Sequence, residues 1–272
     1  MKSTRRQFIG QLAAIPVAVA FAGKAVAAPG PAWVMGSQSY SFRKFDTIGA
    51  INGVQKLGLN SIEFCGVHFP CDANDPDLGK VKELIKKTGI QVPCYGVESF
   101  GADEAANRKK FEFAKSMGIK ILTAHPKPES FDNLDKLTEE YGVKIAIHNH
   151  GPKAQYNTVQ DTLDAIKDHS PMIGACVDTG HVIRSNEKPH EVIAALGDRV
   201  HSMHLKDWIH GAEEEILGEG DIDLVAVAKV LKKLKFAGPL MVEYENSPEN
   251  PGPDMKIGLA NWQKAVDQVW KA

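Results

Sequence analysis

Short apolar runs alternate with longer amphipathic segments eight times along the chain, from about residue 33 to the C-terminus. A short apolar run bounded by glycine or polar residues is typical of a buried strand. An apolar residue at every third or fourth position is typical of a helix that buries one face. The predicted strands are Trp33–Phe42, Ser61–Phe64, Gln91–Glu98, Ile121–Pro126, Lys144–His150, Met172–His181, Val200–Asp207 and Pro239–Glu245.

Helical segments fill the intervals between these strands, and several of them end at a glycine, as the left-handed stop of a helix requires. Repeated strand–helix units force neighbouring strands to run parallel. Eight units without a break in composition predict a single (β/α)8 TIM barrel, with an open doubly wound α/β sheet as the alternative. No G-x-G-x-x-G follows any strand, so a dinucleotide site is not supported. The predicted helices are Thr47–Leu57, Asp77–Lys87, Asp103–Met117, Phe131–Tyr141, Val159–Asp168, Pro189–Leu196, Leu224–Leu234 and Asp254–Trp270.

The first 27 residues have the pattern of a bacterial export signal. Arg5 and Arg6 precede Gln-Phe-Ile, and the apolar run Leu12–Ala22 is too short to span a bilayer. Ala25-Val26-Ala27 matches a cleavage site. We therefore expect a twin-arginine signal peptide over residues 1–27, a barrel domain over 28–272, the Tat translocase as a partner during export, and a periplasmic destination. An ordinary secretion signal with a chance arginine pair is the alternative.

Charge and hydropathy narrow the range of partners. Cleavage after Ala27 removes four basic and no acidic residues, which leaves 28 basic and 34 acidic side chains in 245 residues. An acidic chain without basic runs argues against nucleic acid as a partner. No later stretch is long and apolar enough to cross a membrane, so no membrane insertion is expected once the signal is removed.

Cysteines and aromatic residues leave two structural alternatives open. Among the four cysteines, Cys65 and Cys71 are the only local candidates for a disulfide, and the absence of C-x-x-C argues against a cysteine zinc site. Trp262 and Trp270 lie on the last predicted helix. They pack either on the bottom of the barrel or on a second copy of the chain, which makes a homo-oligomer possible.

Polar residues directly follow the apolar run in seven of the eight predicted strands. In a (β/α)8 barrel these strand ends meet at one mouth, where catalytic groups lie. Imidazole and carboxylate groups without clustered thiols suit a divalent ion such as Mn²⁺, Co²⁺, Mg²⁺ or Zn²⁺. The sequence therefore predicts one divalent metal ion at the mouth. The strand-end residues are Glu63, Glu98, His125, His148-Asn149-His150, Asp178-Thr179-Gly180-His181, His204-Leu205-Lys206-Asp207 and Glu243-Tyr244-Glu245.

In their order along the chain, these motifs carry a family resemblance. His-Asn-His, Val-Asp-Thr-Gly-His, His-Leu-Lys-Asp, Leu-Gly-Glu-Gly-Asp and Val-Glu resemble the sugar phosphate isomerase/epimerase branch of the xylose isomerase-like barrels. The resemblance runs from about Ser37 to the end. A related barrel family, the apurinic endonucleases, has an Asp-x-His after the seventh strand that is absent here. Together with the acidic charge, this makes cleavage of phosphodiesters the weaker hypothesis.

The resemblance implies four metal ligands, one from each of the last four strands. Matched by motif, three of them are Asp178, His204 and Glu243, and the fourth position is occupied by His148 where the commoner family pattern has a glutamate. In the 3-epimerases of that family, the two glutamates form a pair that moves a proton between sugar faces. With only Glu243 present, that symmetrical mechanism is in doubt, although the near-neutral pKa of an ordinary histidine would let His148 carry a proton.

The same comparison implies roles for the other strand-end residues. We expect Glu243, together with His148 or Lys206, to move a proton next to a substrate carbonyl. The expected contacts to the sugar substrate come from Glu63, His125, His150 and His181.

Three functions follow in order of preference: a metal-dependent isomerase or epimerase of a small keto-sugar, a periplasmic lyase or hydrolase of 3-keto-glycosides, and a non-catalytic sugar-binding barrel that retains its metal.

Overall fold

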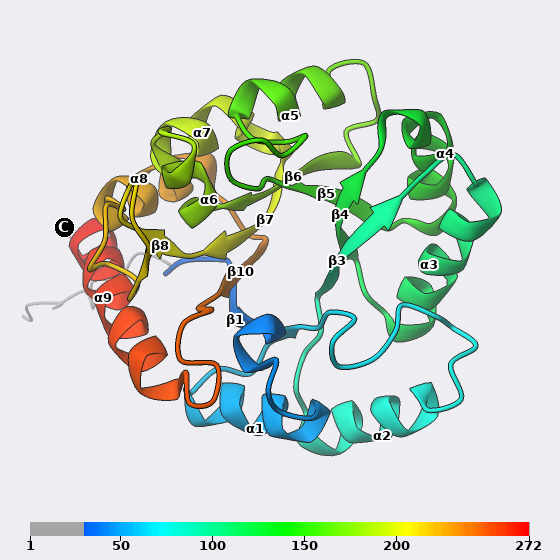
Figure 1. Cartoon of the computed structure of the whole chain (residues 1–272), viewed down its shortest axis with the longest axis horizontal. Coiled ribbons are helices and arrows are strands. Elements are labelled where there is room, and N and C mark those ends of the chain that lie inside the picture. The colour runs from blue at the N-terminus through cyan, green and yellow to red at the C-terminus, as the bar shows by residue number, and fades with distance from the viewer. Residues whose placement is uncertain (1–29, 272) are drawn as a thin grey trace, which may run out of the picture.

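The computed structural model describes residues 30–271, so the predicted signal peptide lies outside the described residues. Eight parallel strands alternate with helices around one axis, which confirms the predicted (β/α)8 fold (Figure 1). The barrel strands are β1 Val34–Gln38, β2 Ile62–Glu63, β3 Cys94–Phe100, β4 Ile121–Pro126, β5 Lys144–His148, β6 Ile173–Asp178, β7 Val200–Leu205 and β10 Pro239–Val242. The helices are α1 Thr47–Lys56, α2 Leu78–Thr88, α3 Glu104–Met117, α4 Phe131–Tyr141, α5 Val159–Ile166, α6 Thr179–Arg184, α7 Pro189–Leu196, α8 Leu224–Leu234 and α9 Gly252–Trp270.

The sheet follows the order β2-β1-β10-β7-β6-β5-β4-β3. The two outermost strands, β2 and β3, meet through single bridges that pair Ser61 with Gln91 and Phe64 with Tyr95. These bridges nearly close the barrel, so the open doubly wound sheet is wrong. Strand order follows the sequence around the ring, and therefore all eight strand ends face the same mouth.

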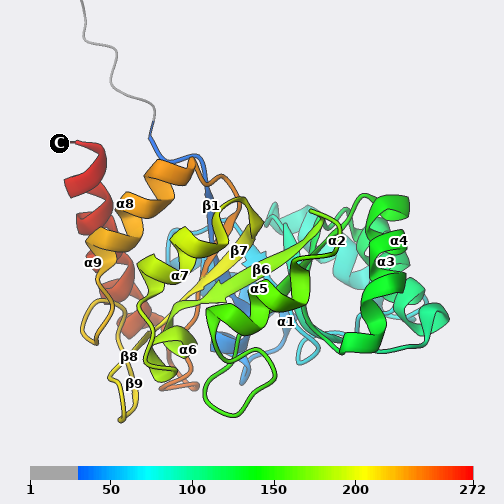
Figure 2. The ribbon, with the colours of Figure 1, turned by 90° about the horizontal axis from the view of Figure 1, so that it is seen from above.

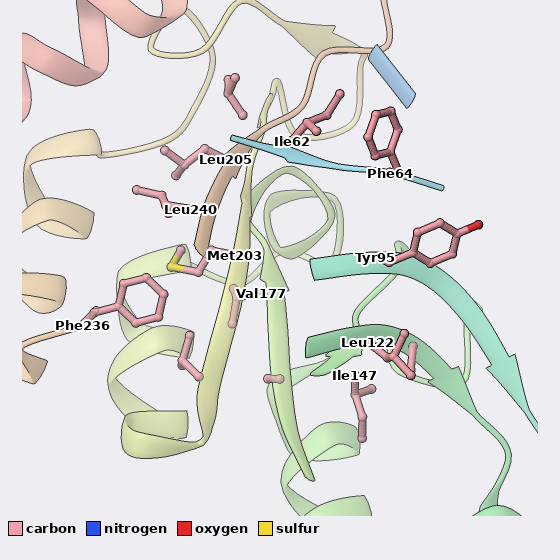
Figure 3. Close-up of a cluster of buried hydrophobic side chains, with 14 of the residues drawn as sticks. Ile62, Phe64, Tyr95, Leu122, Ile147, Val177, Met203, Leu205, Phe236 and Leu240 are labelled. Carbon is pink, nitrogen blue, oxygen red and sulfur yellow. The ribbon is translucent and has the colours of Figure 1, made fainter. Parts of the chain in front are cut away.

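Alternation along the strands separates an outer face from an inner one. Figure 3 shows the outer set, in which side chains such as Leu122, Val177 and Met203 belong to the large buried core. Their burial contributes about 1.5–3 kcal/mol for each large apolar side chain. A second, smaller cluster consists of the inner residues Cys94, Ile121, Ala146, Cys176 and Met241. The barrel interior is therefore packed with small and medium side chains below the mouth.

Several strands are shorter than predicted because side chains at the mouth redirect the chain. The carboxylate of Asp178 accepts a hydrogen bond from the backbone N–H of His181, so β6 ends there and His181 lies on helix α6. Asp207 accepts from the backbone N–H groups of residues 208, 218, 220 and 222, which directs the chain after β7 into the hairpin β8 Asp207–Trp208 and β9 Glu214–Glu215. The first predicted strand ends at Gln38 and continues as the 3-10 turn η1, Ser39–Phe42. The fifth and eighth end at His148 and Val242.

The two ends of the barrel carry different structures. Figure 2 shows α6 and the β8–β9 hairpin at one end, and the first described residues with the C-terminus of α9 at the other. There, Trp33 packs against Trp262 and Trp270, with ring centroids 5.7 and 5.1 Å apart. Of the two placements considered for these tryptophans, the one on the barrel itself is thus observed. Among the described residues, no helix is long and apolar enough to cross a membrane.

Candidate metal centre and active-site cavity

Four buried side chains converge at the mouth, one from the end of each of four neighbouring strands: His148, Asp178, His204 and Glu243. Three of them lie two residues beyond inner-face residues of the barrel interior, which are Ala146, Cys176 and Met241. Because strand alternation returns to the same face after two residues, each strand carries its polar side chain inward at the mouth. This is the set that the sequence motifs predict.

Distances within this cluster are those of atoms that share a ligand. Nδ1 of His204 lies 3.1 Å from Nε2 of His148 and 3.1 Å from Oε2 of Glu243. Oδ2 of Asp178 lies 3.5 Å from the His148 nitrogen and 4.0 Å from the His204 nitrogen. All four ligand atoms lie within 4.8 Å of one another. Ligands about 2.1 Å from a tetrahedral ion are about 3.4 Å apart, so the cluster has the size of a divalent metal site.

The hydrogen bonds around Asp178 leave one oxygen for a ligand. Oδ1 caps α6, whereas the buried Oδ2 accepts no hydrogen bond within the described part of the chain. Asn149 holds the backbone of Asp178 from the opposite face, accepting from its N–H and donating to its carbonyl. A buried carboxylate oxygen without a hydrogen bond is costly, and coordination of a metal ion would satisfy it. The donor set of two imidazoles and two carboxylates therefore fits the predicted ion.

Glu63, one of the predicted substrate contacts, lies behind His204 instead. Its Oε2 is 2.8 Å from Nε2 of His204, and its side chain is fully buried. An acceptor at Nε2 leaves the Nδ1 lone pair of His204 for the metal, which is how carboxylates orient metal-binding histidines. Glu63 does not line the cavity, because its side chain is directed to the buried imidazole of His204.

Lys206, a predicted catalytic group, is buried beside Glu243. Its Nζ pairs with Glu245 and lies 3.9 Å from Oε1 of Glu243. Although burial opposes its charge, the surrounding carboxylates of Glu243, Asp178, Glu245 and Glu214 raise the pKa of Lys206 above its ordinary value. A lysine held in the charged form suits stabilisation of negative charge, and it cannot serve as a general base at neutral pH.

The charged groups at the cluster shift each other's pKa values. Burial opposes the charge of His204, yet Cys176, Glu63 and Glu243 together raise the pKa of this imidazole well above its ordinary value. Burial also opposes the charge of Glu243, but Lys206 and His204 lower the pKa of this carboxyl to about 2. With Glu63 behind His204, three carboxylates surround the two imidazoles, and a divalent cation would neutralise this negative charge in place of a proton.

A cavity of about 600 Å³ opens directly above the cluster, a volume within the range of small-molecule sites. His150 and His181, two of the predicted substrate contacts, lie on its wall with stacked rings 5.3 Å apart. His125, another predicted substrate contact, does not line this cavity. Its ring centroid lies 5.4 Å from that of His150. The cavity is lined by Gln38, Tyr40, Cys65, Gly66, Val67, Gly96, Val97, His148, His150, His181, Arg184, His204, Trp208, Glu243 and Glu245.

Several wall residues were not predicted from the sequence, above all Arg184, Trp208 and the apolar group Tyr40, Val67 and Val97. Arg184 follows His181 by one turn of α6, a helix that the pattern had merged into a strand. Trp208 directly follows His-Leu-Lys-Asp, and this proximity to a recognised motif was the one signal available.

The four cysteines carry free thiols, so the candidate disulfide between Cys65 and Cys71 is not formed. Burial raises the pKa of the Cys65 thiol, which lies on the cavity wall and accepts a hydrogen bond from Ser39. A buried, protonated thiol of this kind is a weak nucleophile.

Comparison with known proteins agrees with this geometry. The model of the xylose isomerase-like TIM barrel family matches residues 51–266, and the chain therefore belongs to this family. An inosose dehydratase from Lactiplantibacillus plantarum is 28% identical over 245 residues, which cover 78% of this chain and 80% of the relative. Other inosose dehydratases match over a shorter range: the chain spans about half the length of these curated relatives, for example 48% of the protein from Clostridium beijerinckii.

Solved structures show the same fold at low sequence identity. The IolI protein with a bound zinc atom superposes with a TM-score of 0.72 at 19% identity, covering 86% of this chain and 98% of the other. The 3-keto-D-glucoside 4-epimerase from E. coli superposes with a TM-score of 0.69 at 15% identity, covering 85% and 99%. The chain is thus a member of a family whose relatives include sugar-processing enzymes.

Proposed function

We propose that the protein is a divalent-metal-dependent enzyme of the sugar isomerase/epimerase type, which moves a proton next to the carbonyl of a small keto-sugar. The observation that carries this proposal is the convergence of His148, Asp178, His204 and Glu243 at the floor of a cavity of about 600 Å³. The zinc atom in the related IolI structure and the epimerases and dehydratases among the relatives support it.

The ion and the residues around it have different roles in the proposed reaction. A divalent ion in such a site supplies polarisation of a carbonyl oxygen, which acidifies the neighbouring C–H. Glu243 is kept ionised by Lys206, so its carboxylate can accept that proton. The fixed charge of Lys206 favours the negative charge that then develops. His148 turns its Nε2 into the ligand cluster, which supports its role as a metal ligand, and Glu243 is the carboxylate proposed for proton transfer.

A lyase or hydrolase acting on 3-keto-glycosides is the second candidate, and the rim of the cavity favours it. Tyr40, Val67 and Val97 are 37%, 53% and 37% exposed and lie on the cavity wall. Large apolar side chains exposed at a polar site often mark a ligand contact. An aglycone attached to the keto-sugar would cover them, whereas a free keto-sugar would leave them in water. The related 3-keto-glucoside epimerase makes this substrate class a reasonable choice.

Isotope exchange separates these functions. Protein loaded in turn with Mn²⁺, Co²⁺, Mg²⁺ and Zn²⁺ is incubated in D₂O with a panel of ketoses and 3-keto-glycosides, with and without a chelator. We expect deuterium at the carbon next to the carbonyl, lost on chelation and in Glu243→Gln. Release of the aglycone with formation of an unsaturated keto-sugar would favour the lyase, and release of the aglycone with free keto-sugar and no exchange would favour direct hydrolysis.

The non-catalytic alternative has its own signature in the same experiment. Tight metal binding with neither exchange nor product on any substrate would overturn the enzymatic proposal. The control is Glu98→Gln, which removes a carboxylate that pairs with Lys110 and does not line the cavity.

We also propose that the protein is exported in folded form and acts in the periplasm, on the basis of the Arg5-Arg6 motif. In the full chain, changing both arginines to lysine preserves the charge of the signal. We expect this pair of substitutions to block export, with the uncleaved protein retained in the cytoplasmic fraction. Normal periplasmic yield from the double-lysine chain would show that export follows an ordinary secretion route.

A further inference from the structure

Among the described residues, Arg184 alone brings a guanidinium to the wall of the cavity, and this group touches His181. The two residues are separated by one turn of α6, so their side chains lie on the same helix face. Nη1 of Arg184 lies 2.9 Å from Nδ1 of His181. This contact determines where the imidazole carries its hydrogen.

A guanidinium has only donors and keeps its proton under all ordinary conditions. Arg184 therefore donates, and Nδ1 of His181 accepts with its lone pair. A neutral imidazole that accepts at Nδ1 carries its hydrogen on Nε2. The second ring nitrogen is then a donor, so it has no lone pair to offer to a metal ion or to a substrate proton.

Two neighbours hold the guanidinium in this position. Its Cζ lies 4.6 Å from the centre of the Trp208 ring, in the geometry of a cation–π contact. On another side lies Gly151, where an added Cβ would approach Cζ of Arg184 to 2.8 Å. The guanidinium therefore occupies a slot between the β8 strand and the loop after β5, and this slot exists because residue 151 has no side chain.

We propose that Arg184 is a positioning residue that fixes His181 as the Nε2–H tautomer, so that His181 donates a hydrogen bond to a substrate oxygen and is excluded from the metal. This inference rests on the proposed function for the identity of the substrate, a keto-sugar. The tautomer itself is a property of the free protein. His181 thereby becomes a fixed donor beside the metal cluster, on the wall where the sugar oxygens would lie.

Nitrogen NMR of the zinc-loaded protein tests the tautomer without any substrate. We expect the ring nitrogens of His181 to show a protonated Nε2 and an unprotonated Nδ1 in the native protein. In Arg184→Met the Nδ1–H form should become populated. The control is Arg108→Met, which removes a guanidinium that pairs with Glu104 and Glu140 on the barrel exterior and should leave the His181 signals unchanged.

A second variant retains the guanidinium of Arg184 but displaces it from His181. In Gly151→Ala the new methyl group would displace the guanidinium, and the flexible arginine side chain can yield without loss of the fold. We expect the His181 signals to shift as in Arg184→Met. A native protein with its hydrogen on Nδ1, or an Arg184→Met protein whose tautomer is unchanged, would overturn the proposal.

Kinetics on the substrate found by isotope exchange then separate positioning from direct binding. Loss of one fixed donor to a developing oxyanion lowers kcat on the order of 10²-fold, so Arg184→Met should show about this loss. In a His181→Phe background, the same change should cost almost nothing further, because Arg184 acts through His181. A full additional loss in the double variant would mean that Arg184 contacts the substrate itself, and would overturn the proposed role. If no substrate turns over, the proposed function fails while the NMR result still stands.

Discussion

The two ends of β7 carry histidines in opposite electrostatic environments. His204 lies at the mouth among carboxylates, and despite its burial its pKa is raised well above the ordinary value. His201 lies three residues earlier, near the start of the strand, and burial together with the positive charges of Lys144 and Arg199 lowers its pKa to about 4. Both imidazoles are almost fully buried. The sign of the neighbouring charge, more than burial, distinguishes them.

The comparison shows that one strand serves two purposes. At the mouth, carboxylates from β2, β6 and the residue after β10 surround His204, and the excess negative charge is what a cation would neutralise. At the opposite end, His201 is buried among the strand starts, where the nearby charges are positive. We therefore expect substitutions at the mouth to affect metal binding and turnover, and substitutions at the strand starts to affect stability.

The largest expected effect is the loss of turnover in Glu243→Gln. Removing the proposed proton acceptor should lower kcat about 10³-fold, the middle of the range for a lost acid–base group. The free energy of unfolding of the metal-free protein should also fall at neutral pH, because the ionised carboxylate that Lys206 and His204 stabilise in the fold is removed. The variant His201→Gln at the other end should retain kcat. Retention of more than a tenth of the native kcat in Glu243→Gln would contradict the assignment of this residue.

Removing the metal should stop turnover, as in the exchange experiment, and it should also lower the stability of the fold by a comparable free energy. A ligand present at 1,000 times its dissociation constant stabilises the folded state by about 4 kcal/mol. We expect chelation to lower the free energy of unfolding by up to this amount, measured by denaturant titration. It should also lower Tm, measured by calorimetry. In Asp178→Asn, the chelator should have much less effect. Equal losses in both proteins would indicate that the stabilising ion is bound elsewhere.

The fold could be predicted because it depends on local alternation, whereas the choice of ligands among the polar strand-end residues came from the family resemblance of the motifs. Apolar runs bounded by helices define the strands, and a polar residue two positions beyond an inner residue such as Cys176 must point into the mouth. Arg184 could not be predicted, since its partner His181 was placed on a strand and the capping by Asp178 that creates α6 is a matter of geometry. The contact between Glu63 and His204 joins two strands that are not neighbours in the sheet, and the sequence pattern does not encode such a contact.

The pH dependence of the unfolding free energy should show the effect of His201, at the start of β7. Because the pKa of His201 falls from 6.5 in the unfolded chain to about 4 in the folded protein, its contribution to stability is complete above pH 6.5 and is lost as the pH falls toward 4. The shift corresponds to about 3 kcal/mol. We expect the difference in unfolding free energy between the native protein and His201→Gln to decrease by up to this amount from pH 7.5 to pH 4. A difference that is constant with pH would mean that His201 titrates normally in the fold.

The smallest expected effect concerns Glu63. It tests most directly whether the carboxylates around His204 favour metal binding. Glu63→Gln keeps an oxygen that can accept from Nε2 of His204 but removes the charge that polarises the ring. Loss of such an outer carboxylate typically lowers metal affinity 10- to 100-fold, and we expect a decrease in this range by competition with a chelator of known affinity. Glu98→Gln, which alters a carboxylate paired with Lys110 away from the cluster, should leave the affinity unchanged. If both variants bind the metal as tightly as the native protein, the orientation of His204 is fixed by packing in the barrel, and the negative charge beneath it is not what makes the mouth a cation site.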